Sequence, residues 1–154
     1  KKVSNFKMTI RFVEANDFEA WLTLWKGYQE FYQSSIDDQV TRSTFSRFLS
    51  EQEPVYCLVI EDEPQKIIGF VHYIFHRSTW SEGNYCYLQD LFVDPAQRAS
   101  GIGRKLIEEV YKIAEEKKCS RVYWLTQETN YQARMLYDRI ADNSGFIQYR
   151  KLFH

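Results

Sequence analysis

The residues whose types and spacing most clearly suit a ligand form the loop at 97–103, of sequence QRASGIG. The loop follows an apolar, strand-like run that ends at Val93, and it precedes a long amphipathic helical pattern. Two glycines at such a junction let the backbone come close to a ligand. The first-turn N–H groups of a helix have no partners inside the helix, and with the helix dipole they attract anions. The loop is therefore a candidate site for phosphate or pyrophosphate, with a ligand-free tight turn as the alternative.

Two better-known phosphate loops do not fit this segment. The dinucleotide fingerprint Gly-x-Gly-x-x-Gly fails because Leu106 stands where the third glycine belongs. The Gly-x-x-x-x-Gly-Lys-[Ser/Thr] loop fails because its spacing is absent and Arg104-Lys105 does not complete it.

Composition narrows the class of protein. The chain has 154 residues, 44% of them apolar, which suffices for one domain with a proper core. Its formal net charge of -1 gives no global basic field of the kind that indicates nucleic-acid binding. No apolar run approaches a membrane span, and no signal-peptide pattern opens the chain. We therefore expect a cytoplasmic protein that binds neither nucleic acid nor membranes.

Met8 starts a plausible natural sequence, so we expect a single domain over 8–154 and treat residues 1–7 as leader or expression-derived. The three cysteines, Cys57, Cys86 and Cys119, form no Cys-x-x-Cys pair. This usage is typical of a reduced protein with buried structural thiols, rather than a disulfide scaffold, a zinc site or a nucleophile.

Hydrophobic periodicity predicts a single mixed α/β sheet. Strand patterns occupy residues 9–13, 55–61, 66–76, 85–93, 121–125 and 145–152, and the turn at 62–65 makes the second and third a hairpin. Helical patterns begin at Asn16 or Asp17, at Thr41, at Gly101 and, through a capping box, at Thr129.

Two motifs resemble those of the GNAT family, the Gcn5-related N-acetyltransferases. Residues 91–95 (LFVDP) followed by Arg98-x-x-Gly101-x-Gly103 resemble motif A of the family. Asn130-x-x-Ala133-x-x-Leu136-Tyr137 resembles its next motif. The resemblance implies the GNAT fold, an α/β (α+β) architecture. Its single, mixed, mostly antiparallel twisted sheet is flanked by helices and splayed at the cofactor-binding strand.

The resemblance also implies acetyl-coenzyme A as the cosubstrate. Its pyrophosphate would lie on the loop amides, and its pantetheine arm along the backbone of Phe92 and Val93. The loop amides would come from Arg98, Ala99, Ser100, Gly101, Ile102, Gly103 and Arg104. The family strand has a bulge near Leu91, whose N–H would polarise the thioester carbonyl. Asn130 would bridge to the arm or merely cap its helix.

Tyr137 matches the general acid of the family, with its hydroxyl directed at the cofactor sulfur. Spacing alone favours a different role, that of an aromatic on the buried face of its helix. The amine must lose a proton before it attacks, because an ammonium has a pKa near 10.

Residues 87–93 (YLQDLFV) resemble the corresponding strand of the diamine and thialysine acetyltransferases, except that Gln89 replaces the Glu of the family. A neutral amide is not a useful base. Asp90, Glu128, a histidine or a water chain is therefore the expected base. His72 and His76 share one strand face without an evident third metal ligand, so we expect packing or pocket roles and no metal.

Acidic and aromatic residues favour a cationic acceptor, although each could instead be a solvated charge or a core aromatic. The candidates are Glu30, Tyr32, Asp37, Trp80, Tyr85 and Gln89. The leading hypothesis is an acetyl-CoA-dependent N-acetyltransferase of a small primary amine, such as a polyamine, diamine or amino-acid-like amine, acting as a homodimer. The alternatives are an enzyme that acetylates protein lysines or N-termini, and a non-catalytic acyl-CoA sensor.

Overall fold

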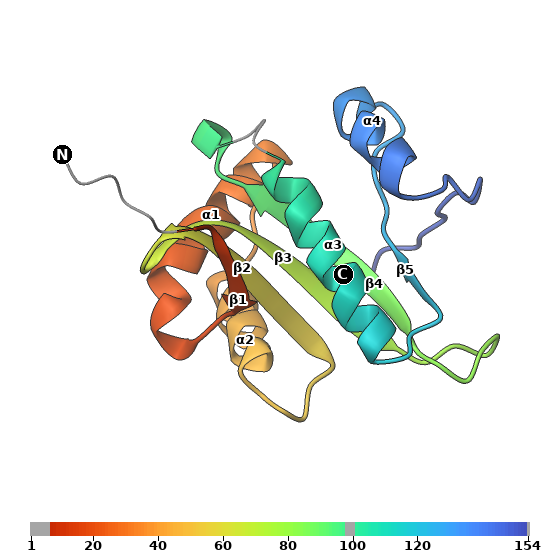
Figure 1. Ribbon diagram of the computed structural model, residues 1–154, viewed down its shortest axis with the longest axis horizontal. Helices are drawn as coiled ribbons and strands as arrows, with labels where there is room; N and C mark the ends of the chain where they lie inside the picture. The colour runs from red at the N-terminus through yellow and green to blue at the C-terminus, as the bar shows by residue number, and fades with distance from the viewer. Residues whose placement is uncertain (1–6, 98–100, 154) are drawn as a thin grey trace. The chain divides into compact units, whose positions relative to one another are not determined.

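The computed structural model describes residues 7–97 and 101–153, and the chain falls into two compact units, Lys1–Trp124 and Leu125–His154. The first unit holds one five-stranded sheet in the order β1-β2-β3-β4-β5 (Figure 1). Its strands are β1 Thr9–Phe12, β2 Val55–Glu63, β3 Lys66–His76, β4 Tyr85–Val93 and β5 Arg121–Tyr123. Neighbouring strands are antiparallel except for β4 and β5, which are parallel. The expected mixed, mostly antiparallel sheet is confirmed.

Three α-helices pack on this sheet: α1 Phe18–Phe31, α2 Asp38–Phe48 and α3 Ile102–Glu116. Short 3₁₀ turns, Ala15–Asp17 and Pro95–Gln97, precede α1 and α3. Helix α2 begins three residues earlier than the predicted Thr41, since Asp37 serves as its N-cap residue. The predicted strand at 121–125 is shorter than expected and ends at Tyr123.

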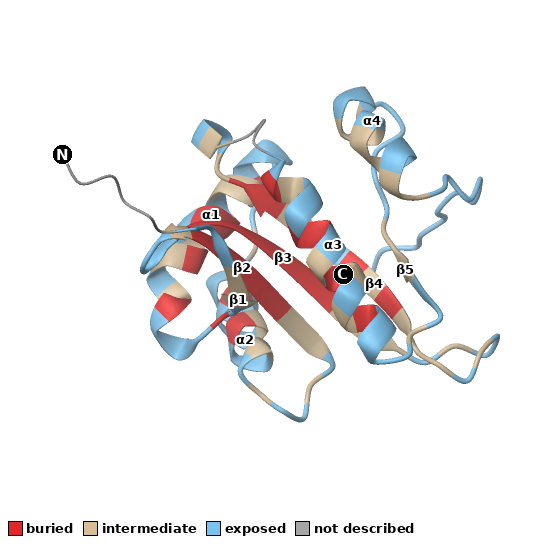
Figure 2. Ribbon diagram, viewed as in Figure 1, coloured by how far each residue is buried: buried red, intermediate tan, exposed pale blue. Residues whose placement is uncertain are grey.

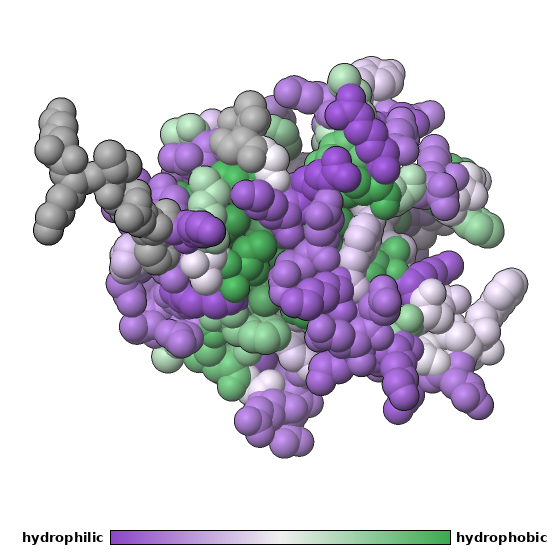
Figure 3. Space-filling view, in the orientation of Figure 1, coloured by the Kyte–Doolittle hydropathy of each residue, from purple (hydrophilic) through white to green (hydrophobic). Residues whose placement is uncertain are grey.

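The two faces of the sheet bury different kinds of side chain. On one face α1 packs stacked indoles against β3, with the rings of Trp21 and Trp25 5.8 Å apart. On the other face Leu106 of α3 is fully buried, and its methyl group lies where a Cβ on Gly69 would contact it. Figure 2 shows the buried residues along β2, β3, β4 and the inner side of α3. Hydrophilic side chains gather over the outer side of α3 (Figure 3).

A bulge interrupts the pairing of β3 with β4. His72 lies opposite Asp90, but Tyr73 lies opposite Leu88, which leaves Gln89 as the extra residue. The bulge therefore falls at Gln89, two residues before the expected position near Leu91, which itself pairs with Val71.

Strands β4 and β5 diverge just before that bulge. Their parallel ladder covers Tyr85 to Tyr87 on β4 and ends where Tyr87 meets Tyr123. Beyond this point β4 continues to Val93, whereas β5 has ended. The expected splay at this strand is thus present.

The second unit carries α4, Tyr131–Ile140. Its N-cap is Asn130, one residue after the predicted Thr129, and the side-chain oxygen of Asn130 accepts a hydrogen bond from the N–H of Ala133 at 3.4 Å. The predicted strand at 145–152 is wrong for this unit, because the described residues after α4 form no ladder. A strand needs a neighbour for its backbone groups, and Phe146, Tyr149 and Phe153 are each 89% exposed here.

Candidate active site

Helix α3 begins directly after a glycine. Gly101 is its N-cap residue in the left-handed conformation (φ 73°), which glycine adopts without steric cost. Among the described residues no side chain caps the helix, no acidic residue occupies its first turn, and nothing lies within 4 Å of a Cβ placed on Gly101. The predicted loop residues Arg98, Ala99 and Ser100 lie outside the described residues. First-turn amides without a carboxylate in the turn suit a diphosphate.

The other predicted loop residues differ in their surroundings. Ile102 is buried and anchors the first turn in the core. A Cβ on Gly103 would lie 3.8 Å from a methyl group of Leu91, so α3 starts directly above β4. The Arg104 side chain pairs with Glu108 one turn later, and both side chains are about half exposed. The backbone of the turn, rather than the Arg104 charge, is therefore the feature that suits an anion.

A chain of hydrogen bonds fixes Asp90 on the α1 side of the sheet. The indole N–H of Trp21 donates to Nε2 of His72 at 3.0 Å, and Nδ1 of His72 lies 2.9 Å from Oδ2 of Asp90. The hydroxyl of Tyr28 donates to Oδ1 of Asp90 at 2.8 Å. An indole nitrogen only donates, so Nε2 of His72 must accept and Nδ1 must carry the proton. His72 is thus held as one neutral tautomer that donates to the carboxylate.

This arrangement decides what Asp90 and His72 can do. Both ring nitrogens of His72 are engaged and the residue is only 3% exposed, so it has no free nitrogen for a substrate. Burial, reinforced by the negative charge of Asp90, raises the pKa of Tyr28 far above its usual range. Tyr28 therefore remains a donor to Asp90. The network anchors β4 beside the Gln89 bulge.

A second cluster lies on the same face, where β4 and β5 begin to diverge. Nε2 of His76 lies 2.6 Å from the hydroxyl of Tyr123, and Nδ1 lies 2.8 Å from the carbonyl oxygen of Arg77. The Arg121 guanidinium lies 3.8 Å from the ring centre of Tyr85 and 5.0 Å from that of Tyr123. One face of the predicted acceptor residue Tyr85 is therefore already covered by a cation of the protein.

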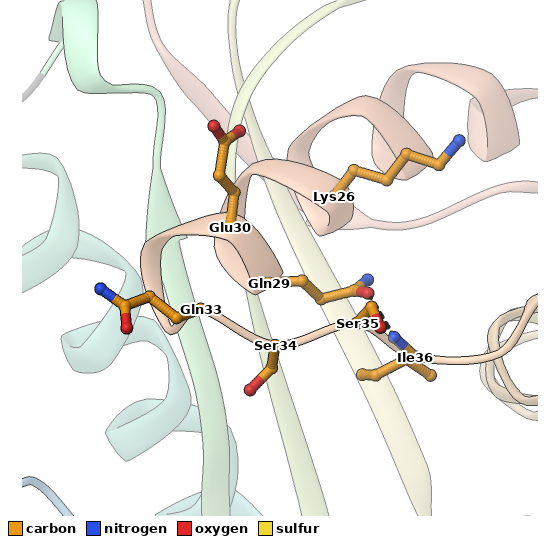
Figure 4. Close-up of a pocket in the computed structure, with 7 residues that line it drawn as sticks. All are labelled: Lys26, Gln29, Glu30, Gln33, Ser34, Ser35 and Ile36. Atoms are coloured by element: carbon orange, nitrogen blue, oxygen red, sulfur yellow. Dashed lines mark hydrogen bonds between the residues drawn. The ribbon is translucent and has the colours of Figure 1, made fainter.

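The hollow beside the α1–α2 connection has a volume of about 650 Å³ and is open to solvent. Its lining residues are Lys26, Gln29, Glu30, Gln33, Ser34, Ser35 and Ile36. Gln29 is buried and closes the turn, since its side chain accepts from the N–H of Ile36 (Figure 4). The same side chain donates to the carbonyl oxygen of Trp25. Glu30 extends away from this hydrogen-bonded turn (Figure 4).

The other predicted acceptor residues are more scattered. Tyr32 is 42% exposed, with its ring 4.9 Å from that of Tyr28, and Asp37 is exposed at the start of α2. Gln89 is exposed at the bulge. Trp80 is 91% exposed on the loop between β3 and β4. The structure thus brings Glu30 and Tyr32 together near the end of α1, while Trp80 stands apart on its loop.

Asn130 and Tyr137 belong to the second unit. Asn130 caps α4, and Tyr137 lies seven residues further along the same helix, half-buried. Spacing favoured a buried aromatic at this position, but α4 contains no fully buried residue.

Sequence reasoning missed the hydrogen bond between His76 and Tyr123, and it missed the support of Asp90 by Tyr28 and, through His72, by Trp21. The aromatic spacing of α1 was visible, but it indicated only a core face. The bulge could not be located without the strand register, so the neighbours of Asp90 stayed hidden.

Within residues 7–97 and 101–153, no three side chains of the metal-binding types come together, and no helix is long and apolar enough to cross a membrane. The thiols of Cys57 and Cys86 are buried, and burial raises the pKa of each, with that of Cys86 reaching about 12. Both are therefore protonated, structural thiols rather than nucleophiles.

The bulged strand β4 and the glycine turn at the start of α3 agree with the expectation of an acyl-transferring enzyme. Residues 18–141 match the model of the acetyltransferase (GNAT) family. The chain belongs to this family, whose members use acetyl-CoA, and it is an N-acetyltransferase.

Curated relatives agree with this assignment. The chain is 35% identical to the D-amino-acid N-acetyltransferase HPA3 of Saccharomyces cerevisiae over 98% of its own length and 94% of that protein. It is 38% identical to the thialysine N-epsilon-acetyltransferase of Bos taurus, over 58% of this chain and 57% of that one.

Solved structures share the fold. The aminoglycoside acetyltransferase AAC(6')-Iy, in complex with a bisubstrate analogue of coenzyme A, superposes with a TM-score of 0.80 at 19% identity, covering 96% of this chain and 99% of that one. The metagenomic aminoglycoside acetyltransferase meta-AAC0020 superposes with a TM-score of 0.76 at 23% identity, covering 99% and 100%.

Proposed function

We propose that this enzyme transfers an acetyl group from acetyl-CoA directly to the primary amine of a small molecule. The observation that carries the proposal is the end of the β4–β5 ladder at Tyr87 and Tyr123. The ladder ends next to the Gln89 bulge, and β4 then leads to the N-terminus of α3. An extended ligand arm with an anionic end fits such a slot.

The donor would be held mainly by backbone. The amides of Gly101, Ile102, Gly103 and Arg104, with those of Arg98, Ala99 and Ser100, would hold the diphosphate, since the first turn of α3 starts at a glycine and carries no acidic residue. Phe92 and Val93 would pair with the amides of the arm, and Asn130 would bridge to it. Bound acetyl-CoA supplies an acetyl thioester as the electrophile.

The chain would contribute three chemical functions. The N–H of Leu91 would polarise the thioester carbonyl, as an oxyanion donor does. Tyr137 would be the acid for the departing sulfur. Asp90, whose oxygens are engaged by His72 and Tyr28, acts through position, because it holds β4 at the bulge. This role for Asp90 replaces that of the expected base.

The acceptor is an amino-acid-like amine, a diamine or a polyamine. Relatives acting on D-amino acids and thialysine support this class, and both substrates pair an amine with a carboxylate. On this chain Glu30, Tyr32, Asp37, Trp80, Tyr85 and Gln89 would form the acceptor side. Glu30 lines the hollow beside α1. A single domain over 8–154, a cytoplasmic location and a homodimer remain predictions.

The experiment is a coenzyme A release assay across D- and L-amino acids, thialysine, diamines, polyamines and lysine peptides. We expect release with a small amine, and Tyr137→Phe should lower kcat about 100-fold with acetyl-CoA binding unchanged. Tyr131→Phe, on the exposed start of the same helix, is the matched control and should keep full turnover. Release with peptides alone would favour a protein acetyltransferase, and cofactor binding without any release would favour a sensor.

A further inference from the structure

The cluster at the point where β4 and β5 diverge contains a tyrosine and a histidine joined by a short hydrogen bond. The carbonyl oxygen of Arg77 only accepts, so Nδ1 of His76 carries the proton in the neutral ring. Nε2 is then the bare nitrogen, and the hydroxyl of Tyr123 donates to it at 2.6 Å. The orientation of this pair is therefore fixed by a backbone group.

The pair lies beside β4, just before its bulge and four residues before Leu91, whose N–H marks the proposed position of the thioester. Tyr123 ends the parallel ladder, opposite Tyr87, and Tyr87 is two residues from the bulged Gln89, a distance of about 6–7 Å along a strand. The ring of Tyr123 stacks on that of Tyr87 with centres 5.0 Å apart. His76 and Tyr123 are both partly exposed, so a solute reaches them.

We propose that Tyr123 and His76 form the proton relay that neutralises the acceptor amine. The ammonium gives a proton to the hydroxyl oxygen of Tyr123, and in the same step Tyr123 gives its own proton to Nε2 of His76. The products are a neutral amine, a neutral tyrosine and an imidazolium, so one proton has moved from nitrogen to nitrogen. The proposal rests on the proposed function, because it supplies the base that Gln89 cannot.

The surroundings of the pair suit a relay. A tyrosine hydroxyl both donates and accepts, so the 2.6 Å contact survives with His76 in either protonation state. Burial raises the pKa of Tyr123, although the positive charge of Arg121 opposes this, and the hydroxyl stays protonated between turnovers. Facing His76 are the rings of Tyr85 and Tyr123, and the charge stacked over them is that of Arg121. The imidazolium then gives its proton to water, which resets the pair.

The test compares Tyr123→Phe and His76→Gln with wild type, using the amine that the release assay identifies. Each variant should lower kcat at pH 7 about 100-fold, and the double variant should lose little more, because the two residues act as a unit. The deficit should shrink to below about tenfold at pH 9.5, where solution chemistry supplies neutral amine from an ammonium with a pKa near 10. Tyr56→Phe, on β2 away from the ladder of β4 with β5, is the control and should behave as wild type.

A second readout is independent of turnover. Nitrogen NMR of the ring of His76 in the ligand-free protein should show a protonated Nδ1 and a bare Nε2, and only the Nε2 signal should move in Tyr123→Phe. A protonated Nε2 in the neutral ring overturns the relay, as does a kcat deficit that stays constant from pH 7 to 9.5. Absence of release by wild type with every amine would defeat the proposed function and the relay together, whereas an active wild type with a constant deficit defeats the relay alone.

Discussion

His72 and His76, four residues apart on β3, make similar hydrogen bonds to partners of different chemistry. In each, Nδ1 donates to an oxygen and Nε2 accepts from an aromatic side chain. The partner of His72 is the indole of Trp21, which cannot accept, so a proton on Nε2 would break that bond. The partner of His76 is a tyrosine hydroxyl, which reverses its role when the proton arrives.

Burial follows the same division. His72 lies under the rings of Trp21, Trp25 and Phe48, whereas His76 lies at the partly exposed end of the strand. A histidine with fixed donors positions its neighbours, and a histidine with a reversible partner moves protons. The comparison predicts that the first matters for stability and the second for rate.

The largest expected effect comes from His72→Leu. The indole N–H of Trp21 and the carboxylate of Asp90 would each lose a partner in a buried setting, so the free energy of unfolding should fall by about 3 kcal/mol. Urea unfolding followed by tryptophan fluorescence measures this change. His76→Gln should lower the free energy of unfolding by less than about 1 kcal/mol, since His76 is partly exposed. Equal losses for the two variants would break the comparison.

The next effect concerns the start of α1, which covers His72. Arg11 donates to both oxygens of Asp17 at 2.8 and 2.9 Å, and this bidentate contact is the main cause that lowers the pKa of Asp17. The N–H of Glu14 also lowers it, and burial opposes the shift. A lowered folded-state pKa adds stability above the unfolded value of about 3.9, and that stability is lost as the pH falls through the folded value.

Asp17→Asn should therefore lower the free energy of unfolding by about 2 kcal/mol at pH 7, and its difference from wild type should shrink below pH 4. Urea unfolding at pH 7, 5 and 3 checks this. Asp38→Asn is the matched control, because Asp38 pairs with Arg42 in an exposed contact worth less than about 0.5 kcal/mol. A difference that grows on acidification would contradict the assigned cause.

Tyr28→Phe should give a smaller effect than His72→Leu or Asp17→Asn, a loss of about 1 kcal/mol in the free energy of unfolding, because Asp90 loses one donor but keeps His72. Since the pKa of Tyr28 is raised far above its usual range, the variant and wild type should release the same number of phenolic protons up to about pH 11. Alkaline absorbance titration counts these protons. One proton fewer in the variant would show that Tyr28 ionises normally and that the network is looser than described.

Periodicity predicted most of the fold because each half-buried strand or helix repeats its apolar residues regularly. The hairpin of β2 with β3 and the helix after the glycine loop are confirmed. The strand at 145–152 failed for a physical reason: alternating apolar residues mark a segment able to pair, but a strand forms only where a neighbour is available.

The sequence predicted less of the candidate site than of the fold. The glycine loop and the Asn130 cap follow from local backbone requirements, so local residues reveal them. The contact of His76 with Tyr123 joins residues 47 apart, and that of Trp21 with His72 joins residues 51 apart. Such contacts depend on register and on the bulge, neither of which periodicity reports.

The bulge at Gln89 has a consequence for how this enzyme can change over generations. Leu88 faces α3 and Asp90 faces α1. On a regular strand, residues at positions i and i+2 point to the same face, so the bulge has reversed the side of Asp90 relative to Leu88. Gln89 is the residue that absorbs this difference, and it is exposed beside the diverging strands. Its side chain contributes to neither packed layer. A substitution at position 89 can therefore be selected for a new acceptor amine without changing the packing on either face of the sheet.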